Sequence, residues 1–385
     1  MNPLLARLQA NRLALTEAGL WRRRRLWAPA LIDFSANDYL GLAREPQLAA
    51  ALAEGANRFG VGSRASALVS GYSPAHEALE QELCRVTGHE AALLFCSGFA
   101  ANLALAATLL QAGDTLIADK YIHASVIDGV QASGAALRRF PHNDLDGAAR
   151  LLGKYPGTAL WTESIFSMDG DGAPLAQLAR LCREHNSLLI VDDAHGFGVI
   201  GEEGMGASRL PEFTRSAGEP GIDIQLVTFG KALGAQGAAI LGSKALIDSL
   251  VACARHYIYS TALSPAQAFC VSEAIRLAAG SDARARLFDN INYFRRGAQA
   301  LGLELLDSAS AIQLLPMADV PSCMAAAEQL RQQGVLVGAI RPPTVPSPRL
   351  RITLSAGHSR PQLDALLAAL AQLPAATLGS PEVQP

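Results

Sequence analysis

Lysine is scarce in this chain of 385 residues: of its 32 basic residues only four are lysines, at positions 120, 154, 231 and 244. Long apolar runs are lacking as well. The longest, residues 99–110, is interrupted by Asn102 and Thr108 and is too short to cross a bilayer. The N-terminus has no apolar block of the signal-peptide kind. We therefore expect a cytoplasmic protein without a membrane segment, in which chemistry based on an amine has only four candidate residues.

An excess of positive charge is also missing. The 32 basic and 35 acidic residues give a net charge of −3, whereas a protein that wraps nucleic acid needs a clustered positive excess. None of the six cysteines forms a C-x-x-C pair, and a chain of this size does not need disulfides. These absences predict reduced thiols, no zinc ribbon or other metal site, and no nucleic-acid partner.

The apolar residues follow a regular order along the chain. Hydrophobic residues make up 50% of the sequence and charged residues 17%, which favours a large core. The first twenty residues carry leucines at helical spacing and predict an amphipathic helix. Further on, helical periodicity alternates with short apolar runs, at residues 91–95, 115–118, 158–161, 188–191, 225–228 and 238–241. Such runs indicate a largely parallel sheet buried between helices, whose ligands bind at the carboxyl ends of the strands.

The length of the chain favours more than one domain. We predict an N-terminal helix and substrate-lining segment over residues 1–44, a large domain over 45–284 and a small C-terminal α/β domain over 285–385. In the small domain the pattern predicts helices near residues 288–301, 324–333 and 361–373 and strands near 312–315 and 350–354. The proline-rich residues 341–348 cannot form a helix and predict a stiff loop.

Asp192 and His195 directly follow one of the predicted strands. There the carboxylate could pair with a ring nitrogen of a heterocycle while the imidazole contacts a ring substituent. A helix-capping aspartate and a satisfied core histidine explain the same residues without a ligand. Residues 196–201 also match G-x-G-x-x-G, but the loop-like residues that follow do not predict the helix that a dinucleotide site requires.

Lys231 follows the next predicted strand, between glycines at 230 and 234. A lysine in apolar surroundings loses solvation, its pKa falls, and its neutral amine can attack carbonyl groups. The alternative is an ordinary loop lysine. Residues 97–98 join a strand to a helix, which suits either a bound phosphate or a plain helix cap, and His123 is placed to stack on a flat ligand. Taken together, these parts are the ones that pyridoxal phosphate requires.

The motifs that carry these residues resemble those of the α-oxoamine synthases, a family of fold-type I pyridoxal-phosphate enzymes. The similarity covers nearly the whole chain, at residues 34–42, 68–80, 97–102, 166–171, 191–196, 228–231 and 340–346. Residues 68–73 and 340–346 are more particular to the branch that makes 8-amino-7-oxononanoate for biotin biosynthesis. The resemblance implies a transferase of the α/β class, with a mostly parallel seven-stranded sheet between helices and a smaller C-terminal α/β domain.

The resemblance also implies how the cofactor is held. Lys231 would carry pyridoxal phosphate covalently, Asp192 would pair with its ring nitrogen, His195 would bond its phenolic oxygen and His123 would stack on its ring. These four are the predicted catalytic residues. The remaining predicted cofactor contacts are Gly98, Phe99, Ser167 and Thr228.

Substrate and subunit contacts follow from the same resemblance. Arg351 matches an arginine that grips the amino-acid carboxylate, for which its planar fork is suited. The other predicted substrate contacts are Arg22, Asn37, His123 and Thr344. The run of four arginines at 22–25 also fits a solvated basic helix end. Residues 260–261 match a segment that reaches the neighbouring subunit's phosphate, which implies a homodimer with shared sites.

The implied reaction is an acyl transfer, the decarboxylative condensation of L-alanine with a pimeloyl thioester of coenzyme A or an acyl-carrier protein. Three alternatives stay open. The first is a sister synthase that uses glycine with another acyl thioester. The second is a nicotinamide-dependent oxidoreductase, suggested by the G-x-G-x-x-G match at residues 196–201. The third is a binding protein without catalytic activity, which would leave the lysine, the aspartate and the histidine without an explanation.

Overall fold

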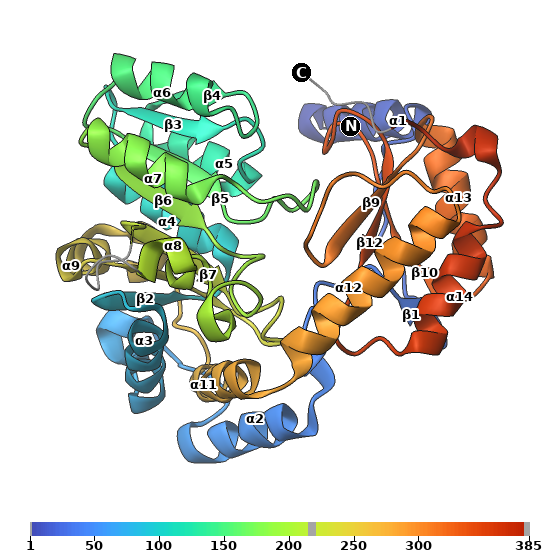
Figure 1. Cartoon of the computed structure of the whole chain (residues 1–385). Coiled ribbons are helices and arrows are strands. Elements are labelled where there is room, and N and C mark those ends of the chain that lie inside the picture. Colours follow the sequence, from blue (N-terminus) through green and yellow to red (C-terminus); the bar gives the residue numbers. More distant parts are fainter. Residues whose placement is uncertain (1, 215–220, 381–385) are drawn as a thin grey trace. The chain divides into compact units, whose positions relative to one another are not determined.

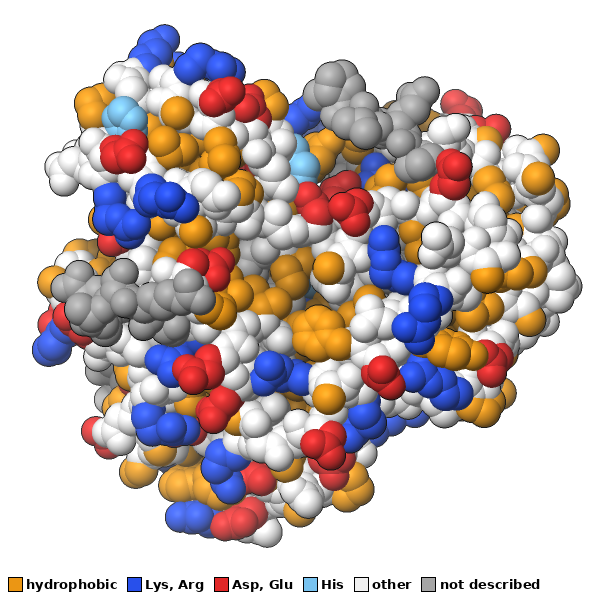
Figure 2. All heavy atoms as spheres, in the orientation of Figure 1, with side chains coloured by type: hydrophobic (Ala, Val, Ile, Leu, Met, Phe, Trp, Pro, Cys, Tyr) orange, Lys and Arg blue, Asp and Glu red, His pale blue; other side chains and the backbone are white. Residues whose placement is uncertain are grey.

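The computed structural model describes residues 2–214 and 221–380, and the chain divides into two compact units, Met1–Ile32 and Asp33–Pro385. The first unit contains helix α1, which confirms the helix predicted near the N-terminus, although none of its residues is buried. Among the described residues no helix is long and apolar enough to span a membrane. On the face drawn in Figure 2, acidic and basic side chains are intermingled.

Helices and strands alternate along most of the second unit. The α-helices are α1 (Pro3–Glu17), α2 (Pro46–Phe59), α3 (Pro74–Thr87), α4 (Gly98–Leu109), α5 (Ala124–Ser133), α6 (Leu145–Lys154), α7 (Leu175–Glu184), α8 (Pro211–Thr214), α9 (Lys244–Cys253), α10 (Arg255–Ile258), α11 (Pro265–Gly280), α12 (Ala283–Ala300), α13 (Val320–Gln332) and α14 (Arg360–Leu370). The strands are β1 (Ile32–Asp33), β2 (Ala91–Phe95), β3 (Thr115–Asp119), β4 (Ala136–Phe140), β5 (Ala159–Glu163), β6 (Leu188–Asp192), β7 (Ile224–Thr228), β8 (Ala238–Gly242), β9 (Ile312–Pro316), β10 (Val335–Leu336), β11 (Gly338–Ile340) and β12 (Arg349–Thr353).

The main sheet has seven strands in the order β2-β8-β7-β6-β5-β3-β4, and it lies among helices in Figure 1. The pairs from β7 through β4 are parallel, whereas β8 runs antiparallel to both of its neighbours. All six strands predicted from the sequence are present. The seventh, β4, lies at the edge of the sheet, and its exposed Arg138 and Arg139 hide it from a search for apolar runs.

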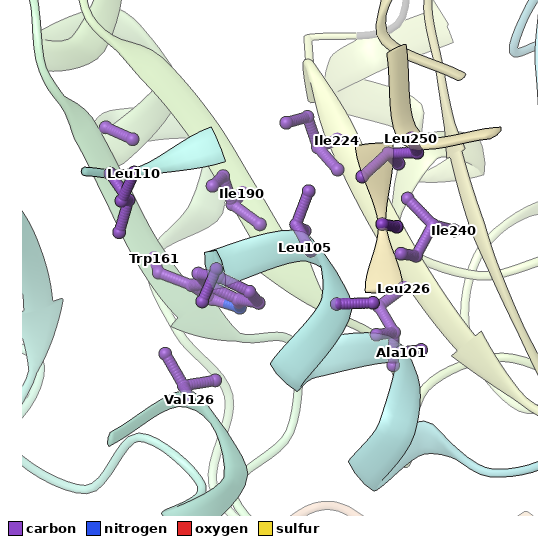
Figure 3. Packing of buried hydrophobic residues seen from close by; sticks show 14 of the residues in the cluster. Ala101, Leu105, Leu110, Val126, Trp161, Ile190, Ile224, Leu226, Ile240 and Leu250 are labelled. Atoms are coloured by element: carbon purple, nitrogen blue, oxygen red, sulfur yellow. The ribbon is translucent and has the colours of Figure 1, made fainter. Parts of the chain in front are cut away.

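Both faces of the main sheet are covered by helices. Side chains of α4, α5 and α9 pack on one face, where Trp161 and Leu105 are fully buried (Figure 3), and side chains of α6, α7 and α8 pack on the other. Successive residues of one strand point to opposite faces, as Leu189 and Ile190 of β6 do. Each leucine of this kind stabilises the fold by about 1.5–3 kcal/mol relative to an exposed position. The helices thus hold the strand ends in fixed register.

A second, antiparallel sheet of three strands, β11-β12-β9, is formed by residues near the C-terminus. Helices α12, α13 and α14 lie near it in sequence and in Figure 1. They confirm the three predicted C-terminal helices, and β9 and β12 confirm the two predicted strands. The proline-rich residues 341–348 form no helix and connect β11 to β12. The predicted domain boundaries at 44/45 and 284/285 stay predictions.

Candidate active site

Three polar residues end neighbouring strands of the main sheet on the same face. Glu163, Asp192 and Thr228 are the last residues of β5, β6 and β7, and each is at most 8% exposed. Because side chains alternate along a strand, they share the face of the core residues two positions earlier, which pack with α4. The carboxyl ends of the strands therefore present two carboxyl groups and a hydroxyl to the start of α4.

Lys231 lies in a turn just after β7, where the Gly234 amide donates to its carbonyl at 2.9 Å. Gly234 has a φ of +62°, and a Cβ there would lie 2.2 Å from the Ala43 nitrogen, so only glycine fits. Burial lowers the pKa of Lys231, Asp192 opposes that effect with its negative charge, and the positive charge of Arg351 adds to the lowering. The amine is therefore more readily neutral than that of a solvated lysine.

His195 is buried beside Tyr39, whose hydroxyl lies 2.5 Å from its Nδ1. Burial and the positive charges of Lys231 and Arg351 hold the pKa of His195 well below its ordinary value. Burial also raises the pKa of Tyr39 to about 12. The pair is thus a neutral imidazole and a neutral phenol, joined by a hydrogen bond.

His123 is exposed at the start of α5, with its ring in edge contact with the ring of Phe99, 6.3 Å between centroids. Its Nδ1 accepts from the Ser125 amide at 3.3 Å and lies 2.7 Å from the Ser125 hydroxyl. One edge of the imidazole is therefore held by the protein. The ring itself remains accessible.

The first turn of α4 approaches the end of β7 closely. Ser97 caps the helix by accepting from the Ala100 amide, and the amides of the first turn have no acceptor within a helix. A Cβ at Gly98 would lie 2.7 Å from Cγ2 of Thr228, so a side chain there would fill the space. Free amides at a helix N-terminus beside a hydroxyl suit an anion such as a phosphate.

Arg351 of β12 joins the second sheet to the segments around the site. Its Nε donates to the Ser167 carbonyl at 2.9 Å, and its Nη1 donates to Oδ1 of Asn37 at 3.0 Å and to Thr353 at 2.9 Å. These groups come from three segments that are far apart in the sequence, at residues 37, 167 and 351–353. Arg351 therefore brings the predicted substrate residue Asn37 and the predicted cofactor residue Ser167 together.

The loop that carries Ser167 is held by ion pairs. His142 contacts Asp119 at 2.9 Å and Asp171 at 2.8 Å, and Arg349 contacts Asp169 at 2.6 Å. Burial opposes protonation of His142, but its two carboxylate partners outweigh burial and raise its pKa to about 10. A charged imidazole thus fixes the loop to the end of β3.

Four further predicted residues lie on other segments of the chain. Thr344 is exposed in the loop before β12, and Ser260 and Thr261 are exposed after α10. Arg22 belongs to the first unit, so its place relative to the others stays a prediction. The G-x-G-x-x-G segment is followed by a single 3₁₀ turn, Glu202–Gly204, and not by the α-helix that a dinucleotide site needs.

Sequence reasoning missed several residues that the fold brings to this place. Tyr39, Asn102 and Glu163 have side chains beside predicted residues, and Ser125 contacts His123. A weak signal existed for two of them, since Tyr39 and Asn102 lie inside the motifs that carried the resemblance. Nothing marked Glu163 or Ser125, because a polar residue at the end of a strand or helix is common.

The donors present fit pyridoxal phosphate in kind. A lysine of lowered pKa, a buried carboxylate, a neutral imidazole and a helix N-terminus meet the needs of its aldehyde, ring nitrogen, phenolic oxygen and phosphate. The space kept open by Gly98 beside Thr228 adds a cradle that a larger residue would fill.

A family model described as aminotransferase class I and II matches residues 29–370. The chain belongs to that family. An 8-amino-7-oxononanoate synthase from Cronobacter sakazakii is 50% identical over 343 residues, 88% of each chain. Among solved structures, an 8-amino-7-oxononanoate synthase from Francisella tularensis is 32% identical, with a TM-score of 0.77 over 90% of this chain and 98% of that one.

A second solved relative contains the cofactor. It is a serine palmitoyltransferase from S. paucimobilis with bound PLP-myriocin, 27% identical, with a TM-score of 0.84 over 94% of this chain and 96% of that one. This class I and II aminotransferase family member therefore has the fold of fold-type I pyridoxal-phosphate transferases, and the predicted fold class is confirmed. The predicted resemblance to the branch that makes 8-amino-7-oxononanoate is confirmed as well.

Proposed function

We propose that this chain catalyses the pyridoxal-phosphate-dependent condensation of L-alanine with a pimeloyl thioester, releasing carbon dioxide and the free thiol and forming 8-amino-7-oxononanoate for biotin. One observation carries the proposal. Lys231, Asp192 and His195 lie together at the ends of β6 and β7 in a chain 50% identical to an 8-amino-7-oxononanoate synthase.

The residues around the cofactor have separate tasks in this proposal. Asp192 binds the ring nitrogen and keeps it protonated, His195 donates to the phenolic oxygen, and His123 covers the ring. The amides of Gly98 and Phe99, with Ser167 and Thr228, bind the phosphate end. When bound, pyridoxal phosphate withdraws electrons from the Cα of an attached amino acid.

Lys231 both holds the cofactor and moves a proton. Its Nζ would hold the aldehyde carbon of the cofactor, and as a free amine it would accept the proton from Cα of the alanine. Because burial lowers the pKa of Lys231, the amine is neutral in a larger fraction of molecules and is able to accept that proton. The electron pair left on Cα would then form a bond to the acyl carbon, and the thiolate would leave and take up a proton. Loss of the alanine carboxylate as carbon dioxide would leave a second electron pair on Cα, and the proton that replaces the carboxylate would come from protonated Lys231.

Arg351 binds the alanine carboxylate in this scheme, and its hydrogen bond to Asn37 holds the guanidinium in orientation. Asn37 and Thr344 also contact the substrate. Arg22 attracts the far carboxylate of the pimeloyl chain or the anionic carrier. The run of four arginines at 22–25 supports that last role.

The assembly belongs to the same proposal. Two copies pair as a homodimer, with Ser260 and Thr261 reaching the phosphate end of the neighbouring site. Their exposure, and the 71% exposure of Tyr259 beside them, leaves this segment available for a second copy. We place the enzyme in the cytoplasm, where its six free cysteines stay reduced.

The deciding experiment compares Lys231→Ala with Lys244→Ala. Lys244 is exposed and paired with Asp248, so its loss controls for the removal of a lysine. We expect the purified protein and Lys244→Ala to show a visible cofactor band that L-alanine perturbs, and to form product from L-alanine and a pimeloyl thioester. Lys231→Ala should fold, lack that band and form no product in the steady state.

Two results would overturn the proposal. Steady-state product formation by Lys231→Ala would remove the lysine from the chemistry. A colourless wild-type protein that stays colourless after addition of pyridoxal phosphate would remove the cofactor. A band perturbed by glycine at lower concentration than by L-alanine would instead assign the chain to a glycine-using synthase.

A further inference from the structure

A chain of hydrogen bonds connects His123 to Asp192 through two buried residues. The side-chain amide of Asn102 donates to Oδ2 of Asp192 at 2.8 Å and to the Ser125 hydroxyl at 2.9 Å. The Ser125 hydroxyl in turn lies 2.7 Å from Nδ1 of His123. Asn102 is 2% exposed and Ser125 fully buried, so water does not compete for these bonds.

The donors and acceptors in this chain allow only one direction. Nδ1 of His123 already accepts from the Ser125 amide, so it carries no proton. The Ser125 hydroxyl therefore donates to Nδ1 and accepts from Asn102. The Asn102 amide cannot turn over, because its Oδ1 would then face the Asp192 carboxylate. Oδ1 is buried and has no hydrogen-bond partner among the described residues, which costs free energy. The two hydrogen bonds that the amide donates hold it in this orientation nonetheless.

Close packing of two helices sets the chain of bonds in place. Gly129 lies one turn after Ser125 on α5, and a Cβ there would lie 2.7 Å from that of Ala106, one turn after Asn102 on α4. The missing side chain lets the helices approach, which brings Ser125 within hydrogen-bond distance of Asn102. Neighbouring residues of both helices, Ala101 and Val126, are anchored in the core of the main sheet (Figure 3).

We propose that Asn102 and Ser125 are positioning residues, which hold His123 with its proton on Nε2 and orient the Asp192 carboxylate. The relevance of this pair to the cofactor rests on the proposed function, in which His123 and Asp192 contact opposite parts of one ring. The hydrogen bonds themselves lie within the protein. The hydrogen bonds connect His123, which covers the ring, to Asp192, which binds the ring nitrogen. The orientations of these two side chains are therefore coupled.

The first test reads the tautomer of His123 in the protein without cofactor. Nitrogen-15 NMR separates protonated from unprotonated ring nitrogens, and His123→Gln assigns the signal. We expect the wild type to carry the proton on Nε2. In Ser125→Ala the share with the proton on Nδ1 should rise about fivefold, the effect of losing one neutral hydrogen bond. The control is Ser249→Ala, since Ser249 is an exposed helical serine that bonds its own helix.

The second test measures the affinity of the same variants for pyridoxal phosphate by absorbance titration. Ser125→Ala and Asn102→Ala should each weaken binding about tenfold, and the double variant should bind about as weakly as either one. Ser125→Thr keeps the hydroxyl and should restore affinity. Two independent structural roles would give losses that multiply.

The outcomes separate the two proposals. An unchanged His123 tautomer in Ser125→Ala, with affinity within twofold of the Ser249→Ala control, would overturn the positioning role even if the enzyme is active. Losses that multiply in the double variant would overturn it as well. A wild-type protein that binds no pyridoxal phosphate would overturn the proposed function, while the tautomer experiment would still decide the hydrogen-bond chain.

Discussion

Glu163 and Asp192 are register partners on the parallel strands β5 and β6, at the position where both strands end. Burial and the neighbouring charge of Asp192 raise the pKa of Glu163 well above its ordinary value. Glu163 therefore keeps its proton to a higher pH than a solvated glutamate does. A proton on Glu163 reduces the repulsion between the two neighbouring carboxyl groups.

This relationship predicts unequal effects of two similar substitutions. Glu163→Gln replaces a carboxyl group whose neutral form is favoured with a neutral amide of similar shape, so kcat should stay within about threefold of the wild type. Asp192→Asn removes a charge that the proposed chemistry uses and should lower kcat by about 100-fold or more. Steady-state assays of both variants with L-alanine and a pimeloyl thioester give the comparison, and equal losses would contradict it.

The same carboxyl group predicts a pH trend in stability. Because the folded state raises the pKa of Glu163, the folded protein holds a proton that the unfolded chain gives up above about pH 4.3. The contribution of Glu163 to stability therefore falls as pH rises above that value. Urea unfolding should show that Glu163→Gln gains stability relative to the wild type between pH 5 and pH 8.

Gly98→Ala tests the close approach of α4 to β7. The added methyl would lie 2.7 Å from Cγ2 of Thr228, so the first turn of α4 must shift, at a cost of about 1–3 kcal/mol. We expect weaker binding of pyridoxal phosphate, by about tenfold or more, measured by absorbance titration. Gly280→Ala is the matched control, since a Cβ there meets no atom within 4 Å. Equal affinity of the two variants would argue against a phosphate contact at Gly98.

Tyr39→Phe removes the hydroxyl that bonds the buried His195. The imidazole loses a partner, which should lower the free energy of unfolding by about 1–3 kcal/mol, measured by urea unfolding. Tyr259→Phe changes an exposed hydroxyl and should cost less than about 0.5 kcal/mol. If the two variants are equally stable, the Tyr39 hydrogen bond makes no net contribution to the free energy of unfolding.

His142→Asn predicts a loss of stability that depends on pH. In the folded state His142 has a pKa of about 10, above the ordinary 6.5, so its protonation stabilises the fold fully below about pH 6.5. That contribution falls as pH rises toward 10. The gap in unfolding free energy between wild type and variant should therefore be largest near pH 6 and shrink toward pH 10. A constant gap would show that the ion pairs with Asp119 and Asp171 contribute little.

The sequence predicted the main sheet well because its strands are buried on both faces and read as apolar runs. It missed β4, an edge strand that carries two arginines, and the short strands β10 and β11, which are too brief to show a period. Lys231, Asp192 and His195 could be found because each lies at the carboxyl end of a strand or within three residues after it. A local sequence pattern thus identifies site residues whose position is defined by a neighbouring strand.

The contacts between those residues could not be read from the sequence. Tyr39 reaches His195 across 156 positions, and Asn102 reaches Asp192 across 90. Such pairs depend on how helices and strands pack against one another. The periodicity of apolar residues within one element does not predict that packing. The same holds for Glu163, whose raised pKa comes from a neighbour on another strand and from burial.

The hydrogen bond between Arg351 and Asn37 joins residues 314 positions apart. During synthesis the segments that carry Lys231, Asp192 and His123 leave the ribosome long before β12 does. A nascent chain can therefore build its main sheet first, but the arginine reaches Asn37 only after β12 has emerged. A chain stopped before residue 351 lacks this contact, so the site is assembled later than the sheet that carries most of it.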